Sequence, residues 1–255
     1  MGRPFQTATR AEPTWPDNGT ASGAFVVEAI ILAGGKAERL GDAAGGRPKA
    51  LVELSGRPLA SYQVEQLAAA GVDRVLVSCA AGQEGLFEAV LGGIGPEITA
   101  VPETEPLGRG GGIRFAALQR RQVGDLFALN GDELVDVDLT RLLALHREQG
   151  AAATITVVPL RSPFGVVDLE DSRVTGFREA PRLDQWVSCG IYALGEEALE
   201  RFPERGDHET TTFPELAAEG RLRALRHEGI WLTVNTPKDL RVANEYLADH
   251  PGWPE

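Results

Sequence analysis

An apolar run occupies residues 25–32 and contains one charged residue, Glu28. Ala33 follows the run, and the two glycines Gly34 and Gly35 come next. Such a run is typical of a strand that is buried on both faces of a sheet. Helical and strand patterns alternate after it, and we expect helices over residues 58–70, 83–92, 109–120 and 138–149 and strands over residues 73–79, 97–101, 125–130 and 154–158. This alternation implies right-handed crossovers and a mostly parallel sheet with helices on both faces.

The second half of the chain has a different pattern. Two short alternating stretches flank Glu170-Asp171-Ser172, which predicts a hairpin, and a strand over 187–193 and a closing helix over 237–248 follow. No hexapeptide repeat follows that helix, so we expect no β-helix domain. We predict a disordered leader over residues 1–24 and one α/β domain over residues 25–255. That domain is expected to be Rossmann-like and doubly wound, with a mixed sheet and a small β-rich lid.

Charge and cysteine content exclude several classes of partner. The chain has 37 acidic and 25 basic residues, a net charge of -12, so nucleic acid is not expected to bind. Cys79 and Cys189 lie far apart outside any Cys/His cluster, which predicts buried free thiols in a reducing compartment. No apolar run approaches the ~20 residues that cross a bilayer, and no secretory signal pattern is present. We therefore expect a cytoplasmic protein without a membrane partner.

The strongest candidate site follows the first strand, at Leu32-Ala33-Gly34-Gly35-Lys36. Glycines at this place let the backbone approach a ligand closely, and their exposed N–H groups favour phosphate. Arg39 and Lys49 follow and supply positive charge for a triphosphate. From these residues alone, a simple turn remains the commoner explanation.

Two well-known phosphate-binding patterns are excluded. The dinucleotide pattern G-x-G-x-x-G fails because Ala37 and Leu40 occupy its second and third glycine positions. The P-loop pattern fails because no G-K-[ST] sequence follows.

The segment from Leu32 to Lys49 resembles the signature of the sugar-1-phosphate nucleotidylyltransferases, L-A-G-G-x-G-x-R-L followed by P-K, with Ala37 replacing its third glycine. Five further motifs follow in the order of that family. Residues 103–113 resemble E-x-x-P-L-G-T-[AG]-G-[AG]-I and are most similar to the mannose-1-phosphate guanylyltransferases. Residues 129–132 contain N-G-D, and residues 177–181 resemble F-x-E-K-P. Residues 189–192 resemble the strand that follows F-x-E-K-P in the family, and residues 231–240 resemble W-x-D-x-G-T-P-x-D-L. The resemblance extends from residue 29 to residue 247.

The resemblance implies an activity and a set of site residues. A nucleotidyl group passes from a nucleoside triphosphate to a sugar 1-phosphate, with Mg²⁺, giving a nucleotide sugar and pyrophosphate. By resemblance, Arg39 and Lys49 are catalytic, Leu32, Ala33, Gly34, Gly35, Lys36, Glu103 and Gly108 bind nucleotide, Gly165, Glu179 and Gly190 bind the sugar, and Asp132 binds the metal. The nucleotide is expected at the carboxyl ends of the strands, and the β-rich lid on the sugar side.

Several positions depart from the family pattern. Ala180 replaces a lysine that grips the sugar phosphate, and Arg178 or Arg182 is a candidate to reach that phosphate instead. Thr233 replaces a second metal-binding aspartate. Some uridylyltransferases have a metal-binding asparagine in a similar V-N stretch, so we assign that role to Asn235.

The residue at position 103 predicts which base of the nucleoside triphosphate the site prefers. Related pyrimidine-specific enzymes have a glutamine there, whereas Glu103 is a carboxylate that only accepts hydrogen bonds. Guanine offers two adjacent donors to a carboxylate, which favours GTP. The alternative is that Glu103 points to solvent and backbone atoms near Gly108 read the base. Arg109, in place of a common threonine, adds a cation near the nucleotide.

Two other functions remain open at this stage. Ala180 and Thr233 favour a non-catalytic homologue that binds nucleotide sugars and regulates a partner, although Arg39, Lys49 and Asp132 are intact. The other is a nucleotidyltransferase of the same fold that acts on a non-sugar phosphate. Homo-oligomers are possible under each hypothesis.

Overall fold

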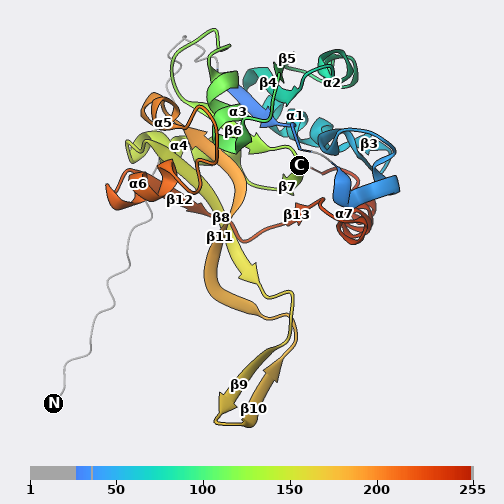
Figure 1. The fold of residues 1–255 in the computed structure, drawn as a ribbon, viewed down its shortest axis with the longest axis vertical. Coiled ribbons are helices and arrows are strands. Elements are labelled where there is room, and N and C mark those ends of the chain that lie inside the picture. The colour runs from blue at the N-terminus through green and yellow to red at the C-terminus, as the bar shows by residue number, and fades with distance from the viewer. Residues whose placement is uncertain (1–26, 36, 254–255) are drawn as a thin grey trace, which may run out of the picture.

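The computed structural model describes residues 27–35 and 37–253 and is built around one seven-stranded sheet (Figure 1). The strands lie in the order β12-β8-β11-β6-β1-β4-β5. Their bounds are β1 Val27–Leu32, β4 Val72–Ala80, β5 Glu97–Glu103, β6 Leu126–Asn130, β8 Ala153–Arg161, β11 Arg182–Leu194 and β12 Leu222–Arg226. The ladders within this sheet are parallel except the two made by β11. The predicted mixed, doubly wound α/β class is confirmed.

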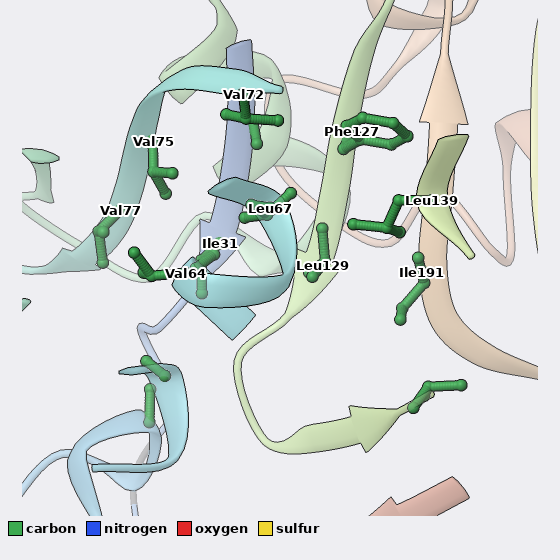
Figure 2. Packing of buried hydrophobic residues seen from close by; sticks show 14 of the residues in the cluster. Ile31, Val64, Leu67, Val72, Val75, Val77, Phe127, Leu129, Leu139 and Ile191 are labelled. Atoms are coloured by element: carbon green, nitrogen blue, oxygen red, sulfur yellow. The ribbon is translucent and has the colours of Figure 1, made fainter. Parts of the chain in front are cut away.

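Helices cover both faces of the sheet because its central strands are apolar on both sides. The helices are α1 Leu59–Ala69, α2 Glu84–Leu91, α3 Gly108–Ala117, α4 Leu139–Glu148, α5 Glu196–Arg201, α6 Thr212–Ala218 and α7 Pro237–Asp249. Ile31 packs with Val64 and Leu67 of α1, and Figure 2 shows these side chains close together. Its neighbour Ile30 belongs to a second buried cluster with Ile113 of α3. Burial on both faces is what the opening apolar run predicts.

Several short elements lie outside the seven-stranded sheet. They are the 3-10 helices η1 Glu38–Ala44 and η2 Lys49–Leu51 and the strands β2 Glu53–Leu54, β3 Arg57–Pro58, β7 Glu133–Val135 and β13 Trp231–Thr233. Leu54 of β2 and Leu134 of β7 belong to a third buried cluster. Leu40 of η1 packs there with Val234 and with Leu247 of α7. This packing joins the segment after β1 to the C-terminal segment, which lies almost 200 residues later.

The predicted hairpin projects from the body as an arm (Figure 1). It consists of β9 Val166–Glu170 and β10 Arg173–Arg178, which form a two-stranded sheet of their own. The cross-strand pairs Val167–Phe177 and Leu169–Val174 are apolar, and all four side chains are exposed. The long strands β8 and β11 connect this arm to the body.

Cys79 and Cys189 are buried and unpaired with each other, as predicted. No helix in the described residues has the length and apolar character that crossing a membrane requires. The predicted leader, residues 1–24, lies outside the described part of the chain.

Candidate active site

A cavity of about 590 Å³ opens at the carboxyl ends of β1, β4, β5 and β6. This is the place where open α/β sheets bind ligands. Six residues predicted from the sequence line it, namely Leu32, Gly34, Gly35, Glu103, Gly108 and Asp132. Ala33 is buried just below, and its N–H donates to the carbonyl of Ser78 at 2.7 Å. Lys36 falls outside the described residues.

Two glycines allow the Asn130–Asp132 segment to pack tightly against its neighbours. The N–H of Gly131 donates to the Leu32 carbonyl at 2.9 Å, and a Cβ on Gly131 would lie 2.5 Å from that oxygen. Gly190 has a φ of +69°, and a Cβ there would lie 2.3 Å from Nδ2 of Asn130. Side chains at either position would displace Asp132. Gly190, predicted to bind sugar, therefore supports the segment that carries Asp132.

Two glutamines of α1 fix the rest of this segment. The Nε2 group of Gln63 donates to the carbonyls of Asn130 (2.7 Å) and Glu133 (2.8 Å). Gln66 binds two further carbonyls, at residues 135 and 137, with distances of 2.8 Å. Buried carbonyls need such partners, so these side chains determine the backbone path on both sides of Asp132.

Four residues predicted from the sequence come together beside the cavity. The ammonium of Lys49 lies 2.5 Å from Oδ2 of Asp132 and 2.5 Å from Oδ1 of Asn235. Arg39 donates to the same Asn235 oxygen at 3.2 Å. Only 10% of the Lys49 side chain is exposed, whereas 28% of the Asp132 side chain is. A pair of cations thus faces a carboxylate and an amide oxygen.

The start of α7 holds Asn235 in place. Thr236 and Asp239 form a capping box, and the Asp239 carboxylate also accepts from the N–H of Asn235 at 3.1 Å. The N–H of Val234 donates to the Asp132 carbonyl at 2.9 Å. These bonds bring the backbones of the two predicted metal ligands together.

The oxygen pair of Asp132 and Asn235 fits a magnesium ion in its chemistry. Both oxygens already converge on one cationic group, the Lys49 ammonium. Magnesium prefers oxygen ligands, often takes only one or two carboxylates, and fills its shell with water and substrate phosphate. The described residues contain no group of three or more His, Cys, Asp or Glu side chains arranged for a metal. Thr233, the alternative position, pairs with Glu133 in the β13–β7 ladder.

Glu133 is a residue of this region that sequence reasoning missed. Burial, as the larger cause, and the adjacent charge of Asp132 together raise its pKa to about 7. Its carboxylate accepts from the indole N–H of Trp231 at 3.0 Å and from Nδ2 of Asn130 at 3.2 Å. Its position directly after Asn130-Gly131-Asp132 was the only available signal.

Glu103 lies in the cavity wall and holds the loop that follows it. Its Oε1 accepts from the Ser78 hydroxyl at 2.6 Å, and its Oε2 accepts from the N–H of Leu107 at 2.9 Å. Each carboxylate oxygen has a second lone pair, so these two bonds leave capacity for a ligand. Glu103 therefore does not point to bulk solvent.

The predicted sugar residues Gly165 and Glu179 lie together at the base of the arm. A Cβ on Gly165 would lie 2.4 Å from the Phe177 ring and 3.1 Å from Oε2 of Glu179. Neither of the two residues lines the 590 Å³ cavity. Two of the three sugar candidates therefore lie together at the arm, whereas Gly190 lies against Asn130.

Both candidates for the missing lysine have other partners. Arg178 donates to Asp168 of the arm at 3.1 Å, and Arg182 donates to Glu228 at 3.2 Å. Ala180, at the lysine position itself, has a φ of +44°. Either arginine would have to exchange an exposed ion pair to reach a phosphate, and such pairs are weak.

Comparison with known proteins identifies the family. A family model described as nucleotidyl transferase matches residues 28–250. The chain belongs to the nucleotidyl transferase family. The resemblance found in the motifs is thereby confirmed for nearly the whole described body.

Two curated relatives of this nucleotidyl transferase are named as mannose-1-phosphate guanylyltransferases. Probable mannose-1-phosphate guanylyltransferase 2 of Arabidopsis thaliana is 33% identical over 231 residues, which are 84% of this chain and 63% of that protein. The mannose-1-phosphate guanylyltransferase of Mycobacterium tuberculosis is 32% identical over 226 residues, which are 84% of this chain and 62% of that protein. The chain spans a little over three fifths of the length of these curated relatives.

Solved structures share the fold. HddC from Yersinia pseudotuberculosis superimposes with a TM-score of 0.69 at 23% identity, covering 87% of this chain and 100% of that one. A putative glucose-1-phosphate thymidylyltransferase from Bacillus anthracis gives a TM-score of 0.72 at 18% identity, covering 88% and 96% of the two chains. At these identities the similarity establishes a common architecture.

A buried histidine of this nucleotidyl transferase predicts a pH-dependent stability. His208 is fully buried, it stacks on Phe202, and neither ring nitrogen has a hydrogen-bond partner among the described residues. Burial lowers its pKa to about 4 from an ordinary value of 6.5. Between these values the unfolded chain binds more protons at this residue, so the contribution of His208 to stability should fall by about 3 kcal/mol as pH falls from 6.5 to 4. Glu133, whose pKa is raised to about 7, acts in the opposite direction, so the prediction concerns the difference that His208 makes.

Denaturant unfolding of the wild type and of His208→Phe across this pH range tests the prediction. Phenylalanine fills a similar volume and does not titrate, so the free energy of unfolding of the variant should rise relative to that of the wild type by about 3 kcal/mol as pH falls from 6.5 to 4. An unchanged slope in the variant would assign the pH dependence to other groups.

Proposed function

We propose that this chain transfers a nucleotidyl group from a nucleoside triphosphate, preferably GTP, to a sugar 1-phosphate, releasing pyrophosphate. The observation that carries the proposal is the convergence of Arg39, Lys49, Asp132 and Asn235 beside a cavity at the carboxyl ends of the strands. The names of the relatives support the acceptor class and the guanine base.

The chemistry requires charge stabilisation and positioning rather than a nucleophilic side chain. An oxygen of the acceptor phosphate attacks the α-phosphorus, the new P–O bond forms, and the bond to the departing pyrophosphate breaks. Arg39 and Lys49 offset the negative charge of the triphosphate and of the leaving group. Magnesium held by Asp132 and Asn235 would supply Lewis-acid stabilisation of phosphate oxygens. Gly34 and Gly35 allow the nucleotide to approach the backbone.

A reaction matrix tests the function. Pyrophosphate release is measured with GTP, ATP, CTP, UTP and dTTP against a panel of sugar 1-phosphates and of non-sugar phosphates, with and without Mg²⁺, and the binding of nucleotide sugars is measured in parallel. We expect Mg²⁺-dependent release with GTP and at least one sugar 1-phosphate. Release with a non-sugar phosphate alone would assign the second function left open by the sequence. Nucleotide-sugar binding without release under any condition would favour the regulatory homologue.

The base preference is a separate prediction that rests on Glu103. Its carboxylate lies in the cavity wall and can accept from the two adjacent donors of guanine, N1–H and the exocyclic amino group. The wild type should prefer GTP over UTP and dTTP by orders of magnitude in kcat/KM, because a mismatched base leaves buried groups unpaired. Glu103→Gln should lose much of this preference.

Ser78→Ala is the matched control for this measurement. It removes the hydroxyl that donates to Glu103 at 2.6 Å but keeps the carboxylate, so the selectivity for guanine should persist. A Glu103→Gln variant with full GTP selectivity, or a wild type that prefers UTP, would show that Glu103 only organises its loop.

A further inference from the structure

Arg109 is held in one place by two carboxylates from a distant loop. Its Nε donates to Oδ2 of Asp207 at 2.8 Å, and its Nη2 lies 2.6 Å from Oε2 of Glu209. Glu209 is fixed in turn by the hydroxyl of Tyr192, a fully buried side chain, at 2.9 Å. The charged groups are therefore positioned before any ligand arrives, which is what a specific binding site requires.

The loop that supplies these carboxylates is anchored on α3. The carbonyl of Gly206 accepts from the N–H of Gly110 at 2.9 Å, and the N–H of Gly206 donates to the Leu107 carbonyl at 2.7 Å. A Cβ on Gly108 would lie 2.6 Å from that Gly206 carbonyl. The close contact fixes Asp207 and Glu209 relative to Arg109.

Arg109 stands between two hollows. It lines the 590 Å³ cavity, and it also lines a second, open hollow of about 490 Å³ together with Ser188, Glu209 and Phe213. Among the described residues that line the larger cavity, Arg109 alone carries a positive charge. The side chains of Arg109 and Glu209 remain 43% and 26% exposed. A ligand that extends from the first hollow into the second must pass this pair.

The charge of the cluster indicates what kind of group it binds. Two carboxylates against one guanidinium leave a net negative charge, which disfavours a second phosphate. The Nη1 group of Arg109 has no hydrogen-bond partner among the described residues and can donate, while Glu209 can accept. A donor and an acceptor side by side suit two neighbouring hydroxyl groups, each of which both donates and accepts.

We propose that Arg109 and Glu209 bind adjacent hydroxyl groups of the acceptor sugar and thereby determine which sugar is used. The inference rests on the proposed function and adds a specificity-determining pair that is separate from the arm residues Gly165 and Glu179, neither of which lines the cavity. A charged pair that recognises a hydroxyl rejects an analogue lacking it, because the pair is then left unsatisfied.

Acceptor affinity tests the proposal independently of turnover. Calorimetry with a non-reactive α,β-methylene GTP measures the binding of mannose, glucose and galactose 1-phosphates and of the monodeoxy analogues of the tightest binder. Glu209→Gln keeps an oxygen for Tyr192, and Arg109→Lys keeps the charge, so both variants should fold. Each variant should bind the parent sugar 1-phosphate about 10- to 100-fold more weakly than the wild type does, and it should no longer discriminate against one of the deoxy analogues.

Controls separate this proposal from the proposed function. Arg201→Gln removes a partly buried arginine that pairs with Glu215 and Glu219, and it should leave acceptor affinity unchanged. Equal weakening of every acceptor, deoxy analogues included, would point to phosphate binding and overturn the proposal, as would unchanged discrimination in both variants. A wild type that binds sugar 1-phosphates with this discrimination but releases no pyrophosphate would overturn only the proposed function.

Discussion

Asp132→Asn should lower kcat/KM for nucleotidyl transfer by at least about three decades, or roughly 4 kcal/mol of transition-state stabilisation. In the wild type the Lys49 ammonium lies 2.5 Å from the Asp132 carboxylate. The asparagine keeps the shape of that side chain and an oxygen that can accept from Lys49. It removes the negative charge that attracts a magnesium ion. Initial rates over a range of Mg²⁺ concentrations measure the effect, and a melting curve checks that the fold survives.

Neighbouring positions sharpen this prediction. Asn235→Ala should impair turnover more than Thr233→Ala, because the Asn235 oxygen lies beside Lys49 and Arg39 whereas Thr233 pairs with Glu133 in a small ladder. Greater damage from Thr233→Ala would reverse the choice of second metal ligand. Wild-type rates for Asp132→Asn would remove Asp132 from the chemistry.

Long helices and strands with a clear hydrophobic period were predictable from the sequence. The expected helix over 138–149 is α4 Leu139–Glu148, and the expected strand over 73–79 is β4 Val72–Ala80. The short helices α5 and α6, six and seven residues long, gave no usable period. Strand β11 begins at Arg182 instead of residue 187, because its first residues are largely polar and leave the buried sheet for the arm.

The site was predictable where one motif carries it. Gly34 and Gly35 follow a buried strand, and Arg39 and Lys49 follow the glycines, so their grouping needed no tertiary information. Asn235 is different, since it reaches Lys49 through packing of α7 against η1. The signal for Asn235 was the resemblance of Val234-Asn235 to a V-N stretch of some uridylyltransferases, together with the order of the motifs along the chain.

The partners of Arg109 could not be predicted at all. Asp207 and Glu209 lie almost 100 residues later in a loop without periodicity. Their contact depends on hydrogen bonds between Gly206 and the start of α3, a tertiary arrangement that no local pattern specifies. Long-range polar clusters of this kind are where sequence reasoning stops and structure is needed.

Lys49→Ala should lower kcat/KM by two to four decades, about 3–5 kcal/mol, with the fold intact. Lys49 is 8% exposed and is bound to both Asp132 and Asn235, so its charge is fixed beside the cavity where a triphosphate would lie. A fixed charge in a partly dry site stabilises the transition state more than a solvated one. Single-turnover rates with saturating GTP separate the loss in chemistry from a loss in binding.

Arg47→Ala is the matched control, because Arg47 lies two residues away, is 48% exposed and pairs only with Glu53 among the described residues. It should retain the wild-type rate. The double variant Lys49→Ala/Asp132→Asn provides the stricter test, since the two side chains are in contact and their effects should be strongly non-additive. If Lys49→Ala folds normally and turns over like the wild type, or if the two losses simply add, Lys49 does not act on the triphosphate in concert with Asp132.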